Sequence, residues 1–365
     1  MKLVDRMLQG HRLSLARVLT QVENNTAEGQ EALRLLFPRT GRAHLVGVTG
    51  ASGTGKSSLV NRLTLCFRAQ NARVAIAAVD PSSPFSGGAV LGDRIRMKDL
   101  AGDQDVFIRS MASRGALGGL ARATAAIVQV LDAAGYDLIF IETVGAGQAE
   151  VDIARLAHTT LVVEAPGMGD DIQAIKAGIL EIADILVVNK ADRPGAENAE
   201  KVLRVALESA QPGPRRFLHH GQTMDAADSV ESAAEAWTIP IQRTVSTDGT
   251  GIPELAQHIQ SHLRFLQSTG RWTDREHARL AAQVEAILQQ ALLSRLHTRV
   301  PEKRYNEIMR QVFERSLSPS DAVGALLDDT GKNGARRPRS ASSSRGGPRA
   351  RRSKSSTGNA SGSVL

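Results

Sequence analysis

Residues 50–57 read Gly-Ala-Ser-Gly-Thr-Gly-Lys-Ser and match the phosphate-loop pattern Gly-x-x-x-x-Gly-Lys-Ser. An apolar run at 45–48 precedes the motif, and an amphipathic stretch at 58–67 follows it. Glycines let the backbone wrap around phosphate oxygens, and the following helix directs its N-terminus at the same anion. Lys56 is expected to reach the β- and γ-phosphates, and the Ser57 hydroxyl to ligate Mg²⁺. The residues predicted to line the nucleotide here are Gly50, Ala51, Ser52, Gly53, Thr54, Gly55, Lys56, Ser57 and Ser58.

Between residue 43 and about residue 268, short β-rich runs alternate with helical segments. The predicted strands cover 44–49, 74–80, 138–142, 160–164, 185–189 and 239–245. Most are apolar on both faces, which is typical of a parallel sheet covered by helices on each side. We therefore expect an α/β fold: a P-loop NTPase domain with a mostly parallel sheet, plus N- and C-terminal helical extensions. The expected boundaries are a helical extension at 1–40, the P-loop domain at 41–270, a helical arm at 271–330 and a tail at 331–365.

The charge of the chain is unevenly distributed. The formal net charge is +7, but the residues from Gly331 onward hold nine Lys or Arg and no acid, which leaves about −2 for the rest. This tail is rich in Ser, Gly and Arg and is expected to be disordered, either as a solubilising segment or in contact with nucleic acid. Cys66 is the single cysteine, and no run of 18 apolar residues or secretory signal is present, so we expect a cytoplasmic protein without a membrane span.

A second motif, Asn189-Lys-Ala-Asp192, ends the predicted strand at 185–189. The Asp192 carboxylate can accept hydrogen bonds from N1–H and the exocyclic amine of guanine, a donor pair that adenine lacks. Asn189 would hold the loop in place, and Lys190 would lie along the base. Ser246 and Thr247, after the last strand, would meet the base from the other side. Together with the phosphate loop, this motif predicts a GTPase.

The predicted strand at 138–142 runs into Glu142-Thr-Val-Gly145. Most GTPases have Asp-x-x-Gly at this corner, with the acid beside Mg²⁺ and the glycine amide at the γ-phosphate. The longer Glu142 side chain can still reach the metal through a bound water, and Gly145 falls at the right offset. A plain acid at a strand end is the alternative interpretation.

Further motifs carry a family resemblance. They are Val-Asp-Pro-Ser-Ser-Pro at 79–84, Gly-Asp-Arg-Ile-Arg-Met at 92–97, Ser-Arg-Gly at 113–115, Glu-Thr-Val-Gly at 142–145 with Gly147 and Gln148, the segment 166–176, and Asn-Lys-Ala-Asp at 189–192. With these motifs, over roughly residues 10–315, the chain resembles the G-protein chaperones of adenosylcobalamin-dependent acyl-CoA mutases, formerly described as arginine/ornithine transport ATPases or kinases. It departs from that family in Ser52, where Pro is common, in Thr247, where Ala is common, and in the basic tail.

The resemblance assigns roles to individual residues. It implies GTP/GDP and Mg²⁺ as cofactors, with Asp80, Asp93 and Glu142 around the metal together with Ser57. Three converging carboxylates would repel each other without a cation, which agrees with this placement. Lys176, in the glycine-containing segment 167–176, would act with Lys56 and Glu142 in catalysis when a partner docks, and Gln173 would lie near the nucleotide. Judged without the family, Asp80 is better explained as a strand-end acid and Lys176 as a solvated helix residue.

The resemblance also implies a partner, an adenosylcobalamin-dependent acyl-CoA mutase, with methylmalonyl-CoA mutase as the leading choice. GTP hydrolysis would gate cofactor loading and protect the mutase. Apolar residues at helical spacing within about 273–327 predict a homodimer through this segment, with packing back onto the domain as the alternative. A nucleotide-dependent kinase or transport ATPase, and a metallochaperone GTPase using His219 and His220, are the other functions considered. The sequence offers no separate acceptor site and no Cys cluster for them.

Overall fold

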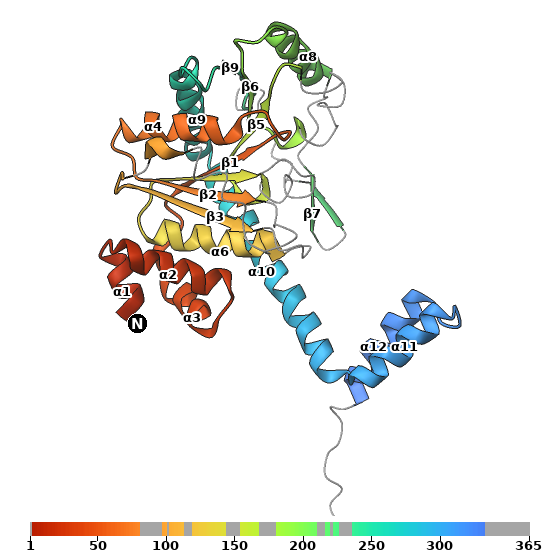
Figure 1. The fold of residues 1–365 in the computed structure, drawn as a ribbon. Helices are drawn as coiled ribbons and strands as arrows, with labels where there is room; N and C mark the ends of the chain where they lie inside the picture. Colours follow the sequence, from red (N-terminus) through yellow and green to blue (C-terminus); the bar gives the residue numbers. More distant parts are fainter. Residues whose placement is uncertain are drawn as a thin grey trace, which may run out of the picture. The chain divides into compact units, whose positions relative to one another are not determined.

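The computed structural model describes residues 2–80, 97–100, 102–112, 119–143, 154–167, 180–209, 216–219, 222–225 and 236–332. The chain divides into two compact units, Met1–Gln290 and Ala291–Leu365. The first unit contains the predicted α/β domain, and the second is helical in its described part (Figure 1).

A seven-stranded sheet with the order β3-β2-β4-β1-β5-β6-β9 forms the centre of the first unit, and all six neighbouring pairs are parallel. The expected α/β fold with a parallel sheet is confirmed. The strands are β1 (His44–Thr49), β2 (Val74–Asp80), β3 (Val106–Ala112), β4 (Leu138–Thr143), β5 (Thr159–Glu164), β6 (Ile185–Asn189) and β9 (Ile241–Thr244). The edge strand β3 is absent from the predicted set, and the last strand is shorter than the predicted 239–245.

Helices cover both faces of this sheet (Figure 1). Alternate side chains of β1 point to opposite faces, as the strand repeat requires. Val46 and Val48 pack in one core with α4 (Lys56–Arg68) and α9 (Ile252–Ser268). Leu45 packs in a second core with α6 (Gly119–Ala133) and the N-terminal helices. The two-sided burial accounts for strands without polar alternation.

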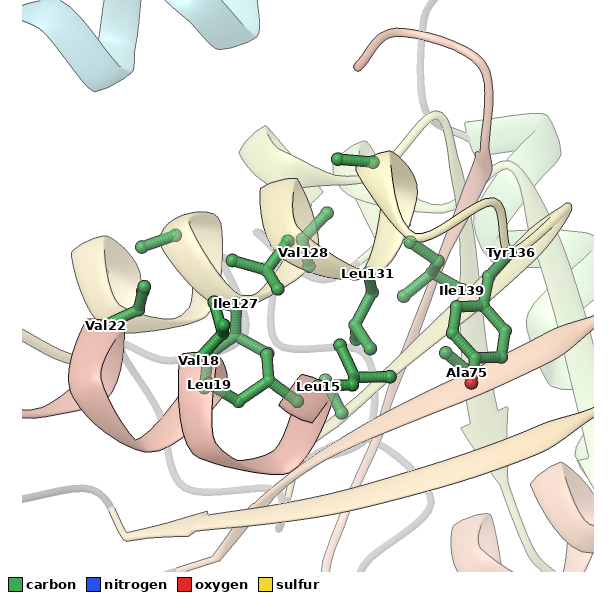
Figure 2. Packing of buried hydrophobic residues seen from close by; sticks show 14 of the residues in the cluster. Leu15, Val18, Leu19, Val22, Ala75, Ile127, Val128, Leu131, Tyr136 and Ile139 are labelled. Atoms are coloured by element: carbon green, nitrogen blue, oxygen red, sulfur yellow. The ribbon is translucent and has the colours of Figure 1, made fainter. Parts of the chain in front are cut away.

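Three N-terminal helices, α1 (Lys2–Leu8), α2 (Arg12–Glu23) and α3 (Ala27–Leu36), pack as a layer on α6. Figure 2 shows Leu15, Val18 and Leu19 of α2 facing Ile127 and Leu131 of α6. Asp132 of α6 accepts hydrogen bonds from the backbone amides of Gly41 (2.6 Å) and Ala43 (3.0 Å), where the chain enters β1. The 1–40 segment therefore contributes a substantial part of one core.

The first unit also contains elements outside the seven-stranded sheet and the helices named above. They are the helix α8 (Ala196–Ser209), the hairpin β7 (Arg216–His219) and β8 (Gln222–Asp225), and the short helices η1 (Phe37–Arg39), η2 (Lys98–Leu100) and η3 (Leu180–Ile182). α10 (Arg271–Arg299) runs on into the second unit, where α11 (Glu302–Phe313) and α12 (Pro319–Lys332) share a small core built on Ile308 and Leu326. None of the helices in the described ranges has the length and apolar character needed to cross a membrane.

A buried polar network at the amino edge of the sheet fastens the start of α10 to the first unit. Arg275 of α10 donates two hydrogen bonds to the buried Asp184 carboxylate, at 2.9 and 2.8 Å. Glu276 accepts a hydrogen bond from His158 Nε2 at 2.6 Å, and His158 Nδ1 accepts one from the Leu45 amide at 3.1 Å. These two bonds fix His158 as the neutral Nε2–H tautomer.

Burial and hydrogen bonding together determine the charge states in this network. Burial lowers the pKa of His44 well below its ordinary value, and the neighbouring His158 lowers it further. Burial also lowers the pKa of His158, against the opposing effect of Glu276. Burial alone would raise the pKa of Glu276, but the hydrogen bonds from His158 and Arg279 outweigh it and bring that pKa to about 2. The network therefore holds neutral histidines beside an ionised carboxylate.

Candidate functional site

The candidate site lies at the carboxyl edge of the parallel sheet, where β1 leads through the predicted phosphate loop into α4. Two glycines make this turn possible. Gly50 has φ +135°, and a Cβ there would lie 2.0 Å from the carbonyl oxygen of Val163 in β5. Gly55 has φ +93°, and a Cβ there would lie 2.6 Å from Asn189 Nδ2. Glycine at both positions lets the loop press against two neighbouring strand ends.

Lys56 is the first residue of α4, and its side chain folds back over the loop. Its Nζ donates hydrogen bonds to the carbonyl oxygens of Gly50 (2.8 Å) and Ala51 (2.9 Å), and the residue is buried. The ammonium thus lies against the loop at the N-terminus of a helix, where backbone amides and the helix dipole favour an anion. This arrangement suits a nucleotide phosphate chain.

Two buried side chains whose oxygen atoms could ligate a metal, Ser57 and Glu142, meet beside the loop. Ser57 Oγ donates a hydrogen bond of 2.6 Å to Glu142 Oε1. Glu142 is the partner of Val48 in the β1–β4 register and of Ala78 in the β2–β4 register, so it projects from the middle of the sheet edge. A hydroxyl and a carboxylate are ligands that Mg²⁺ prefers. The Ser57 hydroxyl and the Glu142 carboxylate are therefore a set of ligands that fits Mg²⁺.

The Asn189 side chain connects three segments of the site. Its Nδ2 donates to the Thr54 carbonyl oxygen of the phosphate loop at 2.8 Å. Its Oδ1 accepts hydrogen bonds from Thr244 Oγ1 (3.1 Å) and Ser246 Oγ (2.8 Å). Asn189 and Thr244 are fully buried, and Ser246 is nearly so. The predicted base-reading loop, the phosphate loop and the loop after β9 are thus one hydrogen-bonded assembly.

The neighbours of Asn189 complete the loop. Lys190 has φ +56° and donates from Nζ to the Gly53 carbonyl oxygen at 2.6 Å. The Ala191 amide donates to the Thr244 carbonyl oxygen at 3.0 Å. Asp192 follows as an exposed side chain, and Thr247 is likewise exposed. Both are therefore accessible to a ligand at this edge of the sheet.

Several predicted site residues lie outside the described residues. These are Asp93, Gly145, Gln173 and Lys176, and also His220 of the histidine pair. The Asp80 backbone ends β2, in register with Ala112 of β3. The roles predicted for all of these residues stay predictions. The structure does bring Ser57, the neighbour of Lys56 in the chain, into contact with Glu142.

Two residues of the site escaped the sequence analysis. Thr244 belongs to no recognisable motif, and a threonine in a strand is too common to indicate a site residue. Arg62 of α4 donates from Nε to the Ser246 carbonyl oxygen (3.0 Å) and from Nη2 to the Thr247 carbonyl oxygen (2.6 Å). These partners lie far away in the sequence, so no local pattern could have revealed the contact.

Comparisons with known proteins agree with this geometry. A family model described as methylmalonyl-CoA mutase-associated GTPase MeaB matches residues 15–301. The GTPase ArgK of Escherichia coli is 31% identical over 330 residues, which is 89% of this chain and 95% of that protein. The mouse methylmalonic aciduria type A homolog, a mitochondrial protein, is 28% identical over 345 residues, covering 89% of this chain and 79% of its own length.

A solved structure, that of a LAO/AO transport system kinase, has a TM-score of 0.64 and 25% identity, covering 90% of this chain and 97% of the other. The phosphate loop, the loop built on Asn189 and a family match over most of the chain lead to one conclusion. The chain belongs to the MeaB family of methylmalonyl-CoA mutase-associated GTPases.

Proposed function

We propose that this protein binds GTP with Mg²⁺, hydrolyses it to GDP and phosphate, and uses the two nucleotide states to gate cobalamin loading and protect an adenosylcobalamin-dependent acyl-CoA mutase. Methylmalonyl-CoA mutase is the proposed partner, on the strength of the family description. The observation that carries the nucleotide part is the Asn189 side chain, which ties the phosphate loop to the two loops that would read the base.

We propose that the phosphate end of the site binds the nucleotide through the positive charge of Lys56 and through backbone amides held in fixed positions. Lys56, already held against the loop, would face the β- and γ-phosphates, and the amides at the start of α4 would point at the same oxygens. Ser57 and Glu142 would hold Mg²⁺, with Asp80 and Asp93 as further proposed ligands. When bound, Mg²⁺ would supply positive charge that offsets the negative charge developing on the phosphates during transfer.

The base end is proposed to select guanine. Asp192 would accept from N1–H and the exocyclic amine, while Lys190, fastened to Gly53, would lie along the base. Ser246 and Thr247 would contact the opposite side. Competition binding of GTP against ATP tests this directly, since equal affinities would rule out a guanine reader.

Coupling to the mutase is proposed to act through Lys176 and the segment 167–176. A cation near the transferring phosphate is needed for fast turnover, and a partner that orders a glycine-containing segment could position it. The experiment is steady-state GTPase activity of the wild type and of Lys176→Ala, each with and without methylmalonyl-CoA mutase. We expect the mutase to stimulate the wild type more than the variant. Equal stimulation of both would contradict the role of Lys176, and no stimulation of either would contradict the partnership.

A homodimer through α10 is also proposed. Its support is a set of large apolar side chains on this helix that are roughly half exposed or more: Val284, Ile287, Leu288, Leu292 and Leu293. Near the start of α10, by contrast, Arg275 and Glu276 form hydrogen bonds with Asp184 and His158 of the first unit. The proposed site of action is the cytoplasm.

A further inference from the structure

Arg62 connects the phosphate-loop helix to the loop that follows β9. It lies six residues after Lys56 on α4 and is partly buried. Its Nε and Nη2 donate to two successive carbonyl oxygens, those of Ser246 at 3.0 Å and Thr247 at 2.6 Å. A guanidinium presents its donors as a rigid planar fork, and hydrogen bonds from a charged donor are stronger than neutral ones. Arg62 therefore holds two adjacent peptide groups of this loop in fixed orientations.

The loop after β9 is a turn closed by its own hydrogen bonds. The Val245 amide donates to the Thr250 carbonyl oxygen and the Gly249 amide to the Val245 carbonyl oxygen, each at 2.9 Å. Asp248 closes the tip by accepting from the Thr250 amide at 2.8 Å. These bonds fix the shape of the turn, whereas Arg62 on one side and Asn189, through Ser246 Oγ, on the other fix its position relative to the site.

The orientation of one amide follows from the Arg62 contact. In a planar trans peptide the C=O and the next N–H point in opposite directions. Because the Ser246 carbonyl oxygen points to Arg62, the Thr247 N–H points away from it. Within the described part of the chain, no protein group accepts a hydrogen bond from this amide. It is a donor at the edge of the site, next to a residue bonded to the base-reading loop.

We propose that Arg62 is a positioning residue for recognition of a 6-oxopurine: it aims the Thr247 amide at the O6 edge of the base. Guanine and hypoxanthine present the O6 acceptor there, whereas adenine presents an amine that cannot accept. Asp192 would read the other edge, where guanine differs from hypoxanthine by its 2-amino group. The inference rests on the proposed guanine site, in which Thr247 already contacts the base, and adds Arg62 as the residue that orients this contact.

The test compares binding of GDP, IDP and ADP to the full-length wild type, Arg62→Ala, Arg62→Lys and the control Arg264→Ala, by titration calorimetry. Arg264 is an exposed arginine of α9 that donates to the Ser261 hydroxyl. Loss of one well-placed hydrogen bond corresponds to about three- to tenfold in affinity. Arg62→Ala should weaken GDP and IDP by the same factor and leave ADP unchanged. Arg62→Lys keeps the positive charge but lacks the planar pair of N–H donors, so it should recover part of the lost GDP and IDP affinity. Arg264→Ala should bind all three nucleotides as the wild type does.

The outcomes separate this inference from the proposed function. Wild type that binds ADP as tightly as GDP refutes the guanine site. Wild type that prefers GDP, with the same preference kept in Arg62→Ala, leaves that site standing and overturns the role of Arg62. Equal weakening of all three nucleotides in Arg62→Ala also overturns it, because Arg62 would then support the fold in general. A fall in the GDP/ADP ratio with an unchanged GDP/IDP ratio supports it.

Discussion

Replacement of Asn189 by Ala should weaken both the fold and nucleotide binding, because this side chain makes three buried hydrogen bonds. They join it to the Thr54 carbonyl oxygen and to the hydroxyls of Thr244 and Ser246, at 2.8, 3.1 and 2.8 Å. Each such bond contributes about 1 kcal/mol net, so the variant should lose about 3 kcal/mol of unfolding free energy. For a unit as large as residues 1–290, that corresponds to a fall in Tm of about 6 °C.

The matched variant Thr244→Val keeps the side-chain shape and removes one of the three bonds. It should cost about 1 kcal/mol and shift Tm by about 2 °C. Thermal unfolding of both variants, without nucleotide, measures these shifts. Titration with GDP should show a larger loss of affinity in Asn189→Ala, since the phosphate loop and the base loops are no longer tied together. A Tm for Asn189→Ala within 1 °C of the wild type, with unchanged GDP affinity, would refute the reasoning.

Four further predictions concern the site, the buried network and the helical arm. Asp192→Asn replaces an acceptor by a donor facing the base and should lower GTP affinity by at least tenfold, with partial rescue by xanthosine triphosphate in a binding assay. Lys56→Ala should abolish tight GTP binding or hydrolysis, and full turnover would show that another cation serves the phosphates. His44 has a lowered folded-state pKa, so the unfolded chain binds its proton first. This contribution to stability should be fully present well above pH 6.5 and be lost progressively as the pH falls below 6.5, in urea unfolding curves. Truncation near residue 270 should convert a dimer to a monomer in light scattering, and a truncated protein that stays dimeric would place the interface elsewhere.

Much of the fold was predictable because its signals are local. Residues 50–57 combine glycines, a lysine and a hydroxyl within a single turn between a strand and a helix, and the structure forms β1, the loop and α4 there. The buried strand β6 contains the continuous apolar run 185–188, and β5 contains a shorter one at 161–163, so each can be recognised without knowledge of its neighbours. The strand β3 was missed because it lies at the edge of the sheet and contains Arg109 and Ser110, which interrupt the apolar run.

The family, too, was accessible from short motifs, since those motifs are contiguous in sequence. Membership was predicted from the segments around residues 79–97, 142–148 and 189–192 and is confirmed by the family match. The roles of Asp93, Gly145 and Lys176 are still predictions that rest on this membership.

Contacts between distant residues were decided by the tertiary structure. The Arg62 side chain reaches Ser246 and Thr247, and His158 reaches Glu276, across more than 100 residues in each case. A parallel sheet brings the carboxyl ends of strands from all over the chain to one edge, and their amino ends to the other. Sequence spacing specifies which residues end each strand, but which strand ends become neighbours depends on the order β3-β2-β4-β1-β5-β6-β9. The nucleotide-binding motifs could therefore be recognised in the sequence. The hydrogen bonds of Asn189 and Arg62 that connect these motifs form only when the sheet brings the strand ends together.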